Sequence, residues 1–491
     1  MKKVLSQVMS VVLVIALITA ILHGVDRFFE YKQSRAKCDA FFDASEDFDI
    51  LFFGTSHAVM GYLPMELWDE YHVTSYSFSN YGQWLPVDYW LLRLALEYHK
   101  PKLVVIDTYY YDFDEKYSKD HLPYAHEELD GFPYSSLKKA AVDDLFPSDK
   151  RWDFLFPFSV YHSQWNSISE NNFRSARDIY TYGQGSDESA LNVDDTALLV
   201  KPQKDIDPVY NTEVQDVESV GKEYLEKSIE LCQEKGIDVL LTTIPFVADE
   251  NYTRINNGIY EIAEKYGVNF YNGLRENIID VKTDLWDAGH LNSSGGRKWT
   301  NKLGEFIKNN YDIPPHTEGD LFDQWNSDYN GEYMNFKIKK MSQNYSMENY
   351  LMLGADKHLS ACVYISNVES YKNSEELNAL LENMVGQKQL ERLKTTVNDG
   401  GDYVLIVDKG HDEIEELDAH TAYSHDFSFG EVKYDEKYLS INQSDNYILE
   451  HFEDGSAPFM QIVLINELTN QVADVSRFSL VDEEQSGQRH V

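Results

Sequence analysis

Short apolar runs alternate with longer amphipathic stretches over residues 48–315. FDILFFG (48–54) and KLVVIDTY (102–109) have the continuous apolar character of buried parallel strands, and WLPVDYWLLRLALEYHK (84–100) has the spacing of an amphipathic helix. Further strands are expected at 73–80, 237–245 and 268–273, and further helices at 61–71, 216–234, 253–266 and from about Ser293. This alternation predicts an α/β fold with helices on both faces of a sheet, which is a three-layer arrangement.

The alternation of strand-like and helix-like segments is interrupted over residues 111–215 and ends near residue 315. Residues 111–215 are polar and aromatic and rich in turn sequences, so they are expected to form an insertion of helices and loops over one end of the sheet. Two prolines at 314–315 and the polar stretch 316–344 predict a linker. Residues 345–485 contain mostly strand-like segments and one clear helix, which predicts a second, α+β domain rich in antiparallel strands.

The N-terminus has the pattern of a membrane anchor. Lys2 and Lys3 precede an apolar run over about residues 4–22, close to the 20 residues that a helix needs to cross a bilayer. No small-x-small cleavage site follows, so residues 1–23 are expected to stay uncleaved as a signal anchor, with 24–47 as a juxtamembrane segment. The lysines before the helix place the N-terminus inside and the bulk of the chain outside the cell.

The net charge excludes some classes of binding partner, and the cysteine content indicates the cellular environment. The 491 residues carry a net charge of −40, which argues against nucleic acid or an anionic lipid surface as a partner. The three cysteines, Cys38, Cys232 and Cys362, are widely spaced and form no zinc or disulfide pattern, so we expect no metal and no cofactor. An extracellular chain without a disulfide framework favours a bacterium of the Gram-positive type.

Two motifs in the α/β domain could carry nucleophilic catalysis. Ser56, in Gly54-Thr55-Ser56-His57, follows the first strand, and ligands bind beyond the carboxyl ends of strands in open α/β sheets. Asp287 and His290 lie between the last strand and the final helix, at a spacing that lets the carboxylate orient the imidazole as a base for the serine. The alternative is structural: a serine that caps the next helix, and a loop histidine with an aspartate in a capping role.

FFGTSH (52–57) and DAGHLN (287–292) together resemble the SGNH/GDSL hydrolase superfamily, and its membrane-anchored branch of alginate O-acetylation and D-alanyl-transfer proteins in particular. The resemblance covers about residues 45–312 and implies a flavodoxin-like sheet with Ser56, Asp287 and His290 as the catalytic triad. SFSNYGQ (77–83) is similar to the stretch where the superfamily has an oxyanion donor, and VYHSQW (160–165) resembles an element of the same branch.

The chain departs from the superfamily after the third strand. Typical members have an asparagine there as an oxyanion donor, whereas this chain has Asp107, whose carboxylate would repel an oxyanion. The oxyanion candidates are therefore Asn80, Gly82 and Gln83, and each missing donor costs about 100-fold or more in rate. Candidate substrate contacts are His162, Trp165 and Tyr109, although core packing is the alternative for each of them.

The C-terminal segments GDYVLIVDKG (401–410) and MQIVLINELTNQVADVSRF (460–478) resemble the interleukin-like EMT inducer type of domain. This resemblance implies a small β-rich accessory domain, over about 345–485, for carbohydrate or partner binding.

These observations predict an extracytoplasmic serine acyltransferase that O-acetylates a cell-surface or secreted polysaccharide through an acyl-Ser56 intermediate. Acetyl-CoA does not occur outside the cell, so the resemblance implies a membrane-bound O-acyltransferase partner as the donor. Two alternatives stay open: a carbohydrate esterase with the same triad, and a catalytically silent scaffold of a polysaccharide-modifying complex.

Overall fold

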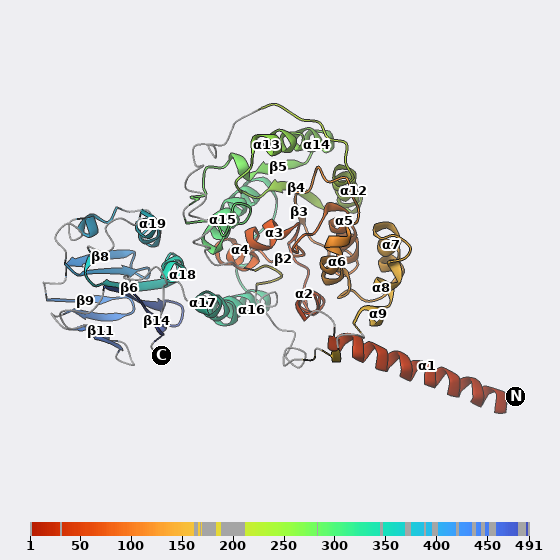
Figure 1. Cartoon of the computed structure of the whole chain (residues 1–491), viewed down its shortest axis with the longest axis horizontal. Coiled ribbons are helices and arrows are strands. Elements are labelled where there is room, and N and C mark those ends of the chain that lie inside the picture. Colours follow the sequence, from red (N-terminus) through yellow and green to blue (C-terminus); the bar gives the residue numbers. More distant parts are fainter. Residues whose placement is uncertain are drawn as a thin grey trace. The chain divides into compact units, whose positions relative to one another are not determined.

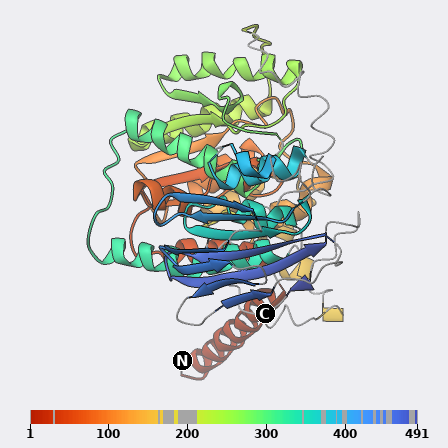
Figure 2. The same cartoon turned by 90° about the vertical axis from the view of Figure 1, so that its left-hand side faces the viewer.

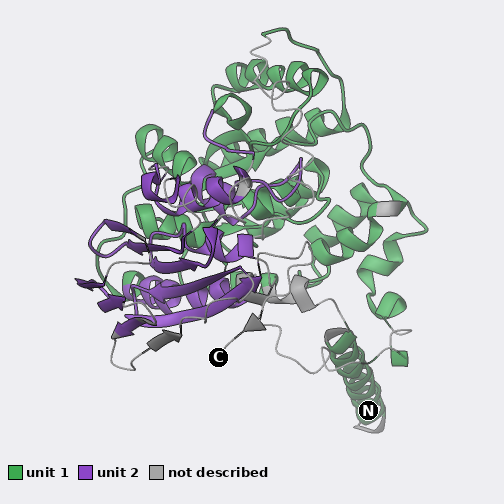
Figure 3. Cartoon of the chain, turned by 60° about the vertical axis from the view of Figure 1, so that its left-hand side comes forward, with its two compact units in different colours: residues 1–187, 208–276, 300–322 green, residues 188–207, 277–299, 323–491 purple. Residues whose placement is uncertain are grey.

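The structure is a computed structural model with two compact units, which we describe separately (Figure 3). Unit 1 comprises residues 1–187, 208–276 and 300–322, and unit 2 comprises residues 188–207, 277–299 and 323–491. Within these units the structure describes residues 2–29, 32–161, 165–166, 168, 183–187, 212–281, 283–343, 347–368, 375–386, 389–394, 401–418, 422–434, 438–442, 447–450, 458–479 and 488–489.

A five-stranded parallel sheet forms the centre of unit 1 (Figure 1). Its strands are β1 (Ile50–Phe53), β2 (Ser75–Ser77), β3 (Leu103–Asp107), β4 (Asp238–Thr243) and β5 (Asn269–Asn272), in the spatial order β2-β1-β3-β4-β5. Every residue of β1 and β3 is buried, as their continuous apolar sequences predicted. This strand order is the one found in flavodoxin-like doubly wound sheets, so the α/β prediction is confirmed at the level of sheet topology.

The helices of unit 1 begin and end near the expected positions. Between the strands of the sheet they are α3 (Ser56–Gly61), α4 (Pro64–Tyr71), α5 (Leu85–Ala95), α12 (Val220–Lys235), α13 (Glu250–Asn257) and α14 (Ile259–Tyr266). The helix expected at 61–71 starts at Pro64, because proline is favoured in the first helical turn. The helix expected at 253–266 is divided at Gly258, between α13 and α14.

The N-terminal region contains two helices. α1 (Lys2–Phe29) includes the stretch Val4–Leu22, which is long and apolar enough to cross a membrane, as a single-pass anchor or a signal sequence would be. α2 (Lys32–Phe42) lies in the expected juxtamembrane segment. The Lys37 ammonium donates a hydrogen bond to the Ser79 carbonyl and the Tyr76 hydroxyl donates one to the Lys37 carbonyl, so α2 is bonded to the segment around β2.

The described part of the insertion is helical, as predicted. It contains η1 (Lys119–His121), α6 (Leu122–Leu129), α7 (Ser136–Leu145), α8 (Arg151–Leu155) and α9 (Phe158–Tyr161). Ser135 caps α7, since its side chain accepts a hydrogen bond from the Lys138 N–H. Phe154 stacks between the His126 and Phe146 rings, at centroid distances of 4.0 and 3.9 Å, and so joins α8 to α6 and to the end of α7.

Unit 2 contains two antiparallel sheets (Figure 2). The six-stranded sheet has the order β15-β14-β13-β6-β7-β8, and the four-stranded sheet has the order β12-β11-β10-β9. The strands are β6 (Leu359–Ile365), β7 (Tyr403–Asp408), β8 (Glu413–Asp418), β9 (Tyr423–Phe427), β10 (Gly430–Tyr434), β11 (Tyr438–Asn442), β12 (Tyr447–Glu450), β13 (Phe459–Asn466), β14 (Gln471–Ser479) and β15 (Gln488–Arg489). Apolar side chains of both sheets share one buried core, among them Val404, Val463, Val432 and Ile441, so the prediction of a strand-rich C-terminal part is confirmed.

Four further α-helices and a π-helical segment are described in the segments around β6. α18 (Met347–Leu353) precedes β6, and α19 (Glu375–Met384) is the one helix that the sequence made clear. The stretch 316–344, expected to be a linker, is largely helical: α16 (Asp320–Ser327), a π-helical segment η5 (Asp328–Tyr333) and α17 (Met334–Gln343) follow one another. Its buried apolar side chains recur every four or five residues, at Trp325, Tyr329, Met334 and Ile338.

The boundary between the units also differs from the one expected at 315. Residues 277–299 group with the C-terminal sheets rather than with the parallel sheet. Arg297 forms an ion pair of 2.6 Å with the buried Asp356, and the Asn383 amide donates a hydrogen bond of 3.2 Å to the Ser294 hydroxyl. α15 (Ser293–Asn310) therefore begins in the residue range of unit 2 and ends in that of unit 1. Polar contacts between segments far apart in the sequence accompany this boundary, and the spacing of apolar residues along the chain gives no sign of such contacts.

Candidate active site

Ser56 lies at the carboxyl end of β1, as the first residue of α3. The N-terminal cap of α3 is Thr55, whose side chain makes no capping hydrogen bond, while its carbonyl accepts from the Ala58 and Val59 N–H groups at 2.9 and 3.1 Å. Ser56 itself is half-buried. The structural alternative, in which Ser56 caps the helix, is therefore not the arrangement found.

Gly54 brings this serine turn against the next strand. Its φ of +155° is one that side chains disfavour, and a Cβ added there would lie 2.6 Å from the Asp107 Cβ and 2.7 Å from the Ala58 Cβ. Only glycine permits so close an approach of β1, β3 and α3. Gly54 thus fixes the path of the chain immediately before Ser56.

Asp287 and His290 meet in unit 2, as the sequence predicted. The His290 Nδ1 lies 2.8 and 3.0 Å from the two Asp287 carboxylate oxygens, so a proton on Nδ1 is held and Nε2 is the nitrogen that can act as a base. Asp287 Oδ1 also accepts from the Gly289 and His290 N–H groups at 2.8 and 2.9 Å. Burial opposes ionisation of Asp287, but the His290 ring and these N–H groups outweigh it and lower the pKa of the carboxyl.

Backbone hydrogen bonds join the two ends of the loop that carries Asp287 and His290. Leu285 and Leu291 form an antiparallel bridge, and the Trp286 N–H donates to the His290 carbonyl at 2.9 Å. The Asn292 amide donates to the Thr283 and Leu285 carbonyls at 2.9 and 3.2 Å, and its oxygen accepts from the Gly295 N–H at 3.1 Å. The carboxylate–imidazole pair is therefore built on a rigid loop, which is a condition for efficient proton transfer.

The three oxyanion candidates form one tight turn after β2. The Asn80 N–H donates to the Gly54 carbonyl at 3.1 Å, so the turn is bonded to the segment just before Ser56. The Gln83 amide donates to the Phe78 carbonyl at 2.8 Å and also to Asp88, and its backbone N–H donates to the Asn80 carbonyl at 3.2 Å. Gln83 therefore stabilises the turn. The Asn80 N–H and its side-chain amide are also used, on the Gly54 carbonyl and the Glu127 carboxyl, so Gly82 is the one of the three whose N–H takes part in none of these bonds.

Two buried carboxyl groups, those of Asp88 and Asp107, lie close to Gln83 and Gly54 respectively. Burial, and then the nearby Asp88 carboxyl, raise the pKa of Asp107 well above its usual range, and the N–H groups of residues 244, 108 and 109 oppose this only in part. Burial also raises the pKa of Asp88 to about 7, although the Gln83 amide acts in the opposite direction. The raised pKa favours the neutral form of the Asp107 carboxyl, which does not repel an oxyanion, and this weakens the objection drawn from the missing asparagine.

The predicted substrate contacts have different surroundings. Tyr109 is half-buried and stacks on the buried His57 ring at a centroid distance of 3.9 Å. Trp165 is 67% exposed. His162 lies outside the described residues.

The candidates therefore fall into two groups. Ser56, Tyr109 and the 80–83 turn belong to unit 1, and Asp287 and His290 belong to the residue range of unit 2. The sequence did not indicate Asp88 or the buried Glu128 of α6, because each looks like a polar position of an amphipathic helix. An acid at a position facing the apolar side of its helix is the signal that could have found them.

One group of side chains among the described residues has the spacing of metal ligands. Ligand atoms of Asp408, His411 and Glu413, in unit 2, lie within 4.8 Å of one another. The Asp408 oxygens already accept from the Ser428 N–H at 2.7 Å and from the His411 N–H at 3.1 Å. We therefore describe this group as a hydrogen-bonded turn.

No protein-family model matches this chain, and no curated protein matches it.

Proposed function

We propose that this protein is a membrane-anchored serine O-acyltransferase that acetylates a polysaccharide outside the cell. The observation that carries the proposal is the Asp287–His290 pair, in which a carboxylate 2.8 Å from Nδ1 leaves Nε2 as the base. Ser56 supplies the nucleophile, because it follows β1 directly at the edge of the sheet where ligands bind in open α/β folds. The strand order and the two motifs also support membership of the SGNH superfamily.

The first half of the reaction forms an acyl enzyme. The Ser56 Oγ attacks the carbonyl carbon of an acyl donor while its proton passes to the His290 Nε2, and Asp287 stabilises the resulting imidazolium. The negative oxygen of the tetrahedral intermediate accepts hydrogen bonds from the Ser56 N–H and the 80–83 turn. The donor's leaving group departs with the proton from Nε2, and the acyl group stays as an ester on Ser56.

The second half returns the enzyme to its starting state. A sugar hydroxyl gives its proton to the His290 Nε2 and attacks the ester carbon. The Ser56 Oγ leaves and takes the proton back, so the products are an O-acyl sugar and free Ser56. A membrane-bound O-acyltransferase is the proposed donor partner, and the strand-rich part over about residues 345–485 is the proposed accessory carbohydrate- or partner-binding domain.

The proposed location follows from α1, which has the length and apolar character of a membrane-spanning helix. Intact mass spectrometry of the protein purified from membranes tests this proposal. An uncleaved anchor predicts a chain that retains residues 4–22, whereas loss of these residues would identify a signal peptide instead.

Ester turnover tests the chemistry. The full chain in detergent is expected to hydrolyse p-nitrophenyl acetate slowly, to carry an acetyl group on Ser56 by peptide mass spectrometry, and to lose both properties in Ser56→Ala. Ser219, which caps α12 through the Lys222 N–H, offers the matched control Ser219→Ala, which should keep them. Activity unchanged in Ser56→Ala would overturn the serine mechanism. Turnover that rises with an added sugar acceptor separates transfer from simple hydrolysis.

A further inference from the structure

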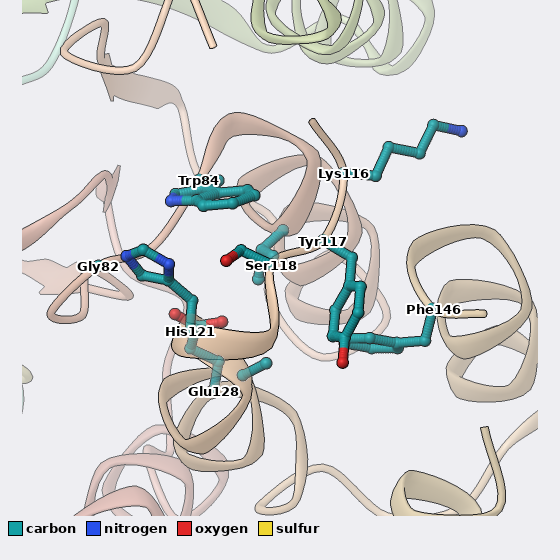
Figure 4. A pocket seen from close by; sticks show the side chains of 10 residues that line it. Gly82, Trp84, Lys116, Tyr117, Ser118, His121, Glu128 and Phe146 are labelled. Carbon is teal, nitrogen blue, oxygen red and sulfur yellow. The ribbon is translucent and has the colours of Figure 1, made fainter. Parts of the chain in front are cut away.

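A small pocket lies beside the 80–83 turn, within unit 1 (Figure 4). Its walls come from that turn, from the loop before α6, from α6 itself and from the end of α7. The hollow encloses about 280 Å³ of empty space, which includes open solvent, and the centres of water-sized groups fit within about 20 Å³. The lining includes Gly82, Trp84, Tyr117, His121, Glu128 and Phe146.

Four polar atoms of this lining are buried without a hydrogen-bond partner among the described residues. They are the Trp84 Nε1, the Tyr117 hydroxyl, the His121 Nδ1 and the Glu128 Oε1. Trp84 and Glu128 are 4% and 7% exposed. Buried polar groups in folded proteins are normally paired, so four such atoms around one hollow indicate a bound polar group that completes them.

The charges around the pocket favour a neutral occupant. Burial, and then the Asp88 and Glu127 carboxyls, raise the pKa of Glu128 well above its usual range, which favours the protonated carboxyl, a form that both donates and accepts a hydrogen bond. Lys116 also lines the pocket, but its ammonium is paired with Asp144 at 2.9 Å. An anion would therefore find no unpaired lysine there.

The shape favours a hydroxyl group carried on a ring. Of the three rings that line the hollow, Trp84 and Phe146 are each 4% exposed and Tyr117 is half-buried, so the Tyr117 ring is the one that the C–H face of a sugar can contact. The inner space is only slightly larger than the roughly 10–15 Å³ that one water needs by this measure, so it accepts a single hydroxyl or hydroxymethyl group. The ring that carries this group would lie towards the solvent-facing side.

The pocket is linked to the serine turn by ring contacts within unit 1. Trp84 contacts Tyr110 at a centroid distance of 6.3 Å, Tyr110 contacts Tyr109 at 4.9 Å, and Tyr109 stacks on His57 at 3.9 Å. His57 is the neighbour of Ser56 in the chain. A sugar in the pocket is therefore within a few side chains of the proposed nucleophile.

We propose that this pocket is a subsite for one neutral sugar residue, whose hydroxyl or hydroxymethyl group fills the space between Trp84, Tyr117, His121 and Glu128. The assignment deepens the proposed function, because it places a residue of the acceptor glycan, but its test is independent of catalysis. Binding is measured on Ser56→Ala, so a failure of the sugar site does not depend on whether the serine is active.

The experiment uses the full chain carrying Ser56→Ala, in a detergent without a sugar head group, which would otherwise compete. Saturation-transfer NMR and calorimetry measure binding of the methyl glycosides of glucose, galactose and N-acetylglucosamine. Tyr117→Phe removes one hydroxyl and should weaken binding about tenfold. Tyr134, which is 69% exposed, provides the matched control Tyr134→Phe, which should bind as before.

A second variant covers the case in which Tyr117→Phe fails to fold. A Cβ on Gly82 would lie 3.0 Å from the His121 Cδ2, so Gly82→Ala displaces the His121 ring and should weaken binding at least as much as Tyr117→Phe. Binding of none of the three glycosides, or equal weakening in Tyr134→Phe, would overturn the proposal. Binding of inorganic phosphate in place of the sugars would overturn it as well, since the pocket would then be an anion site.

Discussion

Replacing Asp88 by asparagine should remove a large pH dependence from the stability of unit 1. Asp88 lies in the first turn of α5 and is 3% exposed, and its carboxylate accepts a hydrogen bond from the Gln83 amide. The charged form of Asp88 acts on two other buried acids, Asp107 and Glu128, and raises the pKa of both. Asparagine has nearly the same shape, can accept the same hydrogen bond, and stays neutral at every pH.

The magnitude follows from the shift in pKa. Burial raises the pKa of Asp88 from 3.8 to about 7. In that interval the folded chain retains a proton that the unfolded chain has lost, so stability is greatest below pH 3.8 and falls as the pH rises towards 7. At about 1.4 kcal/mol for each pKa unit, three units correspond to a loss of about 4 kcal/mol. Asp88→Asn should therefore match the wild type at low pH and exceed it by up to about 4 kcal/mol above pH 7.

Hydrogen exchange can measure the pH dependence of stability for unit 1 separately from unit 2. The opening free energies of peptides that cover β1 and β3 are measured by mass spectrometry between about pH 4 and pH 8, after correction for the intrinsic exchange rate. Asp149→Asn, at an exposed position, is the control and should follow the wild type. A parallel decline of the wild type and Asp88→Asn over this range would refute the reasoning, since the titrating group would then be another one.

Three further predictions concern the serine turn, the proposed catalytic pair and unit 2. Gly54→Ala should lower the free energy of unfolding of unit 1 by about 2 kcal/mol or more in denaturant titrations, because its Cβ would meet Asp107 and Ala58. Gly236→Ala, with open space around its Cβ, should lower it by only about 1 kcal/mol, and equal losses in the two variants would contradict the close approach at β3. Asp287→Asn should lower ester turnover by about 100-fold or more with an unchanged circular dichroism spectrum, and full activity would show that the carboxylate does not orient His290. Lys337→Met leaves Asp356 buried without its 2.7 Å partner and should cost unit 2 about 3–5 kcal/mol in calorimetry; an unchanged melting temperature would mean that Arg297 alone neutralises Asp356.

The parallel sheet could be predicted because its signal is local. FDILFFG and KLVVIDTY are apolar throughout, and both became fully buried strands within a residue or two of the expected bounds. The Asp287–His290 pair could be predicted for a similar reason, since a spacing of three residues brings both side chains to one turn. Both predictions depend only on residues that are close together in the sequence.

The features that escaped prediction depend on partners far away in the sequence. The acids Asp88 and Glu128 look like polar positions of amphipathic helices until the fold places them in the interior. The helices between residues 320 and 343 resembled a linker because their buried aromatic residues are separated by many polar ones. The grouping of residues 277–299 with unit 2 follows from pairs such as Arg297 and Asp356, which are 59 residues apart.

The short connection between α1 and α2 has a consequence for how the proposed acyltransferase would meet its reactants. Two residues separate the end of α1 at Phe29 from the start of α2 at Lys32, and α2 is hydrogen-bonded to the β2 region through Lys37. The three residue steps from Phe29 to Lys32 reach at most about 11 Å, so an uncleaved α1 would leave unit 1 no long tether on which to leave the bilayer. Encounters with a membrane-borne donor then take place in two dimensions, and their frequency depends on the surface density of both proteins rather than on concentration in the medium. Turnover in the membrane should therefore be insensitive to dilution of the cells, but sensitive to dilution of the membrane with added lipid.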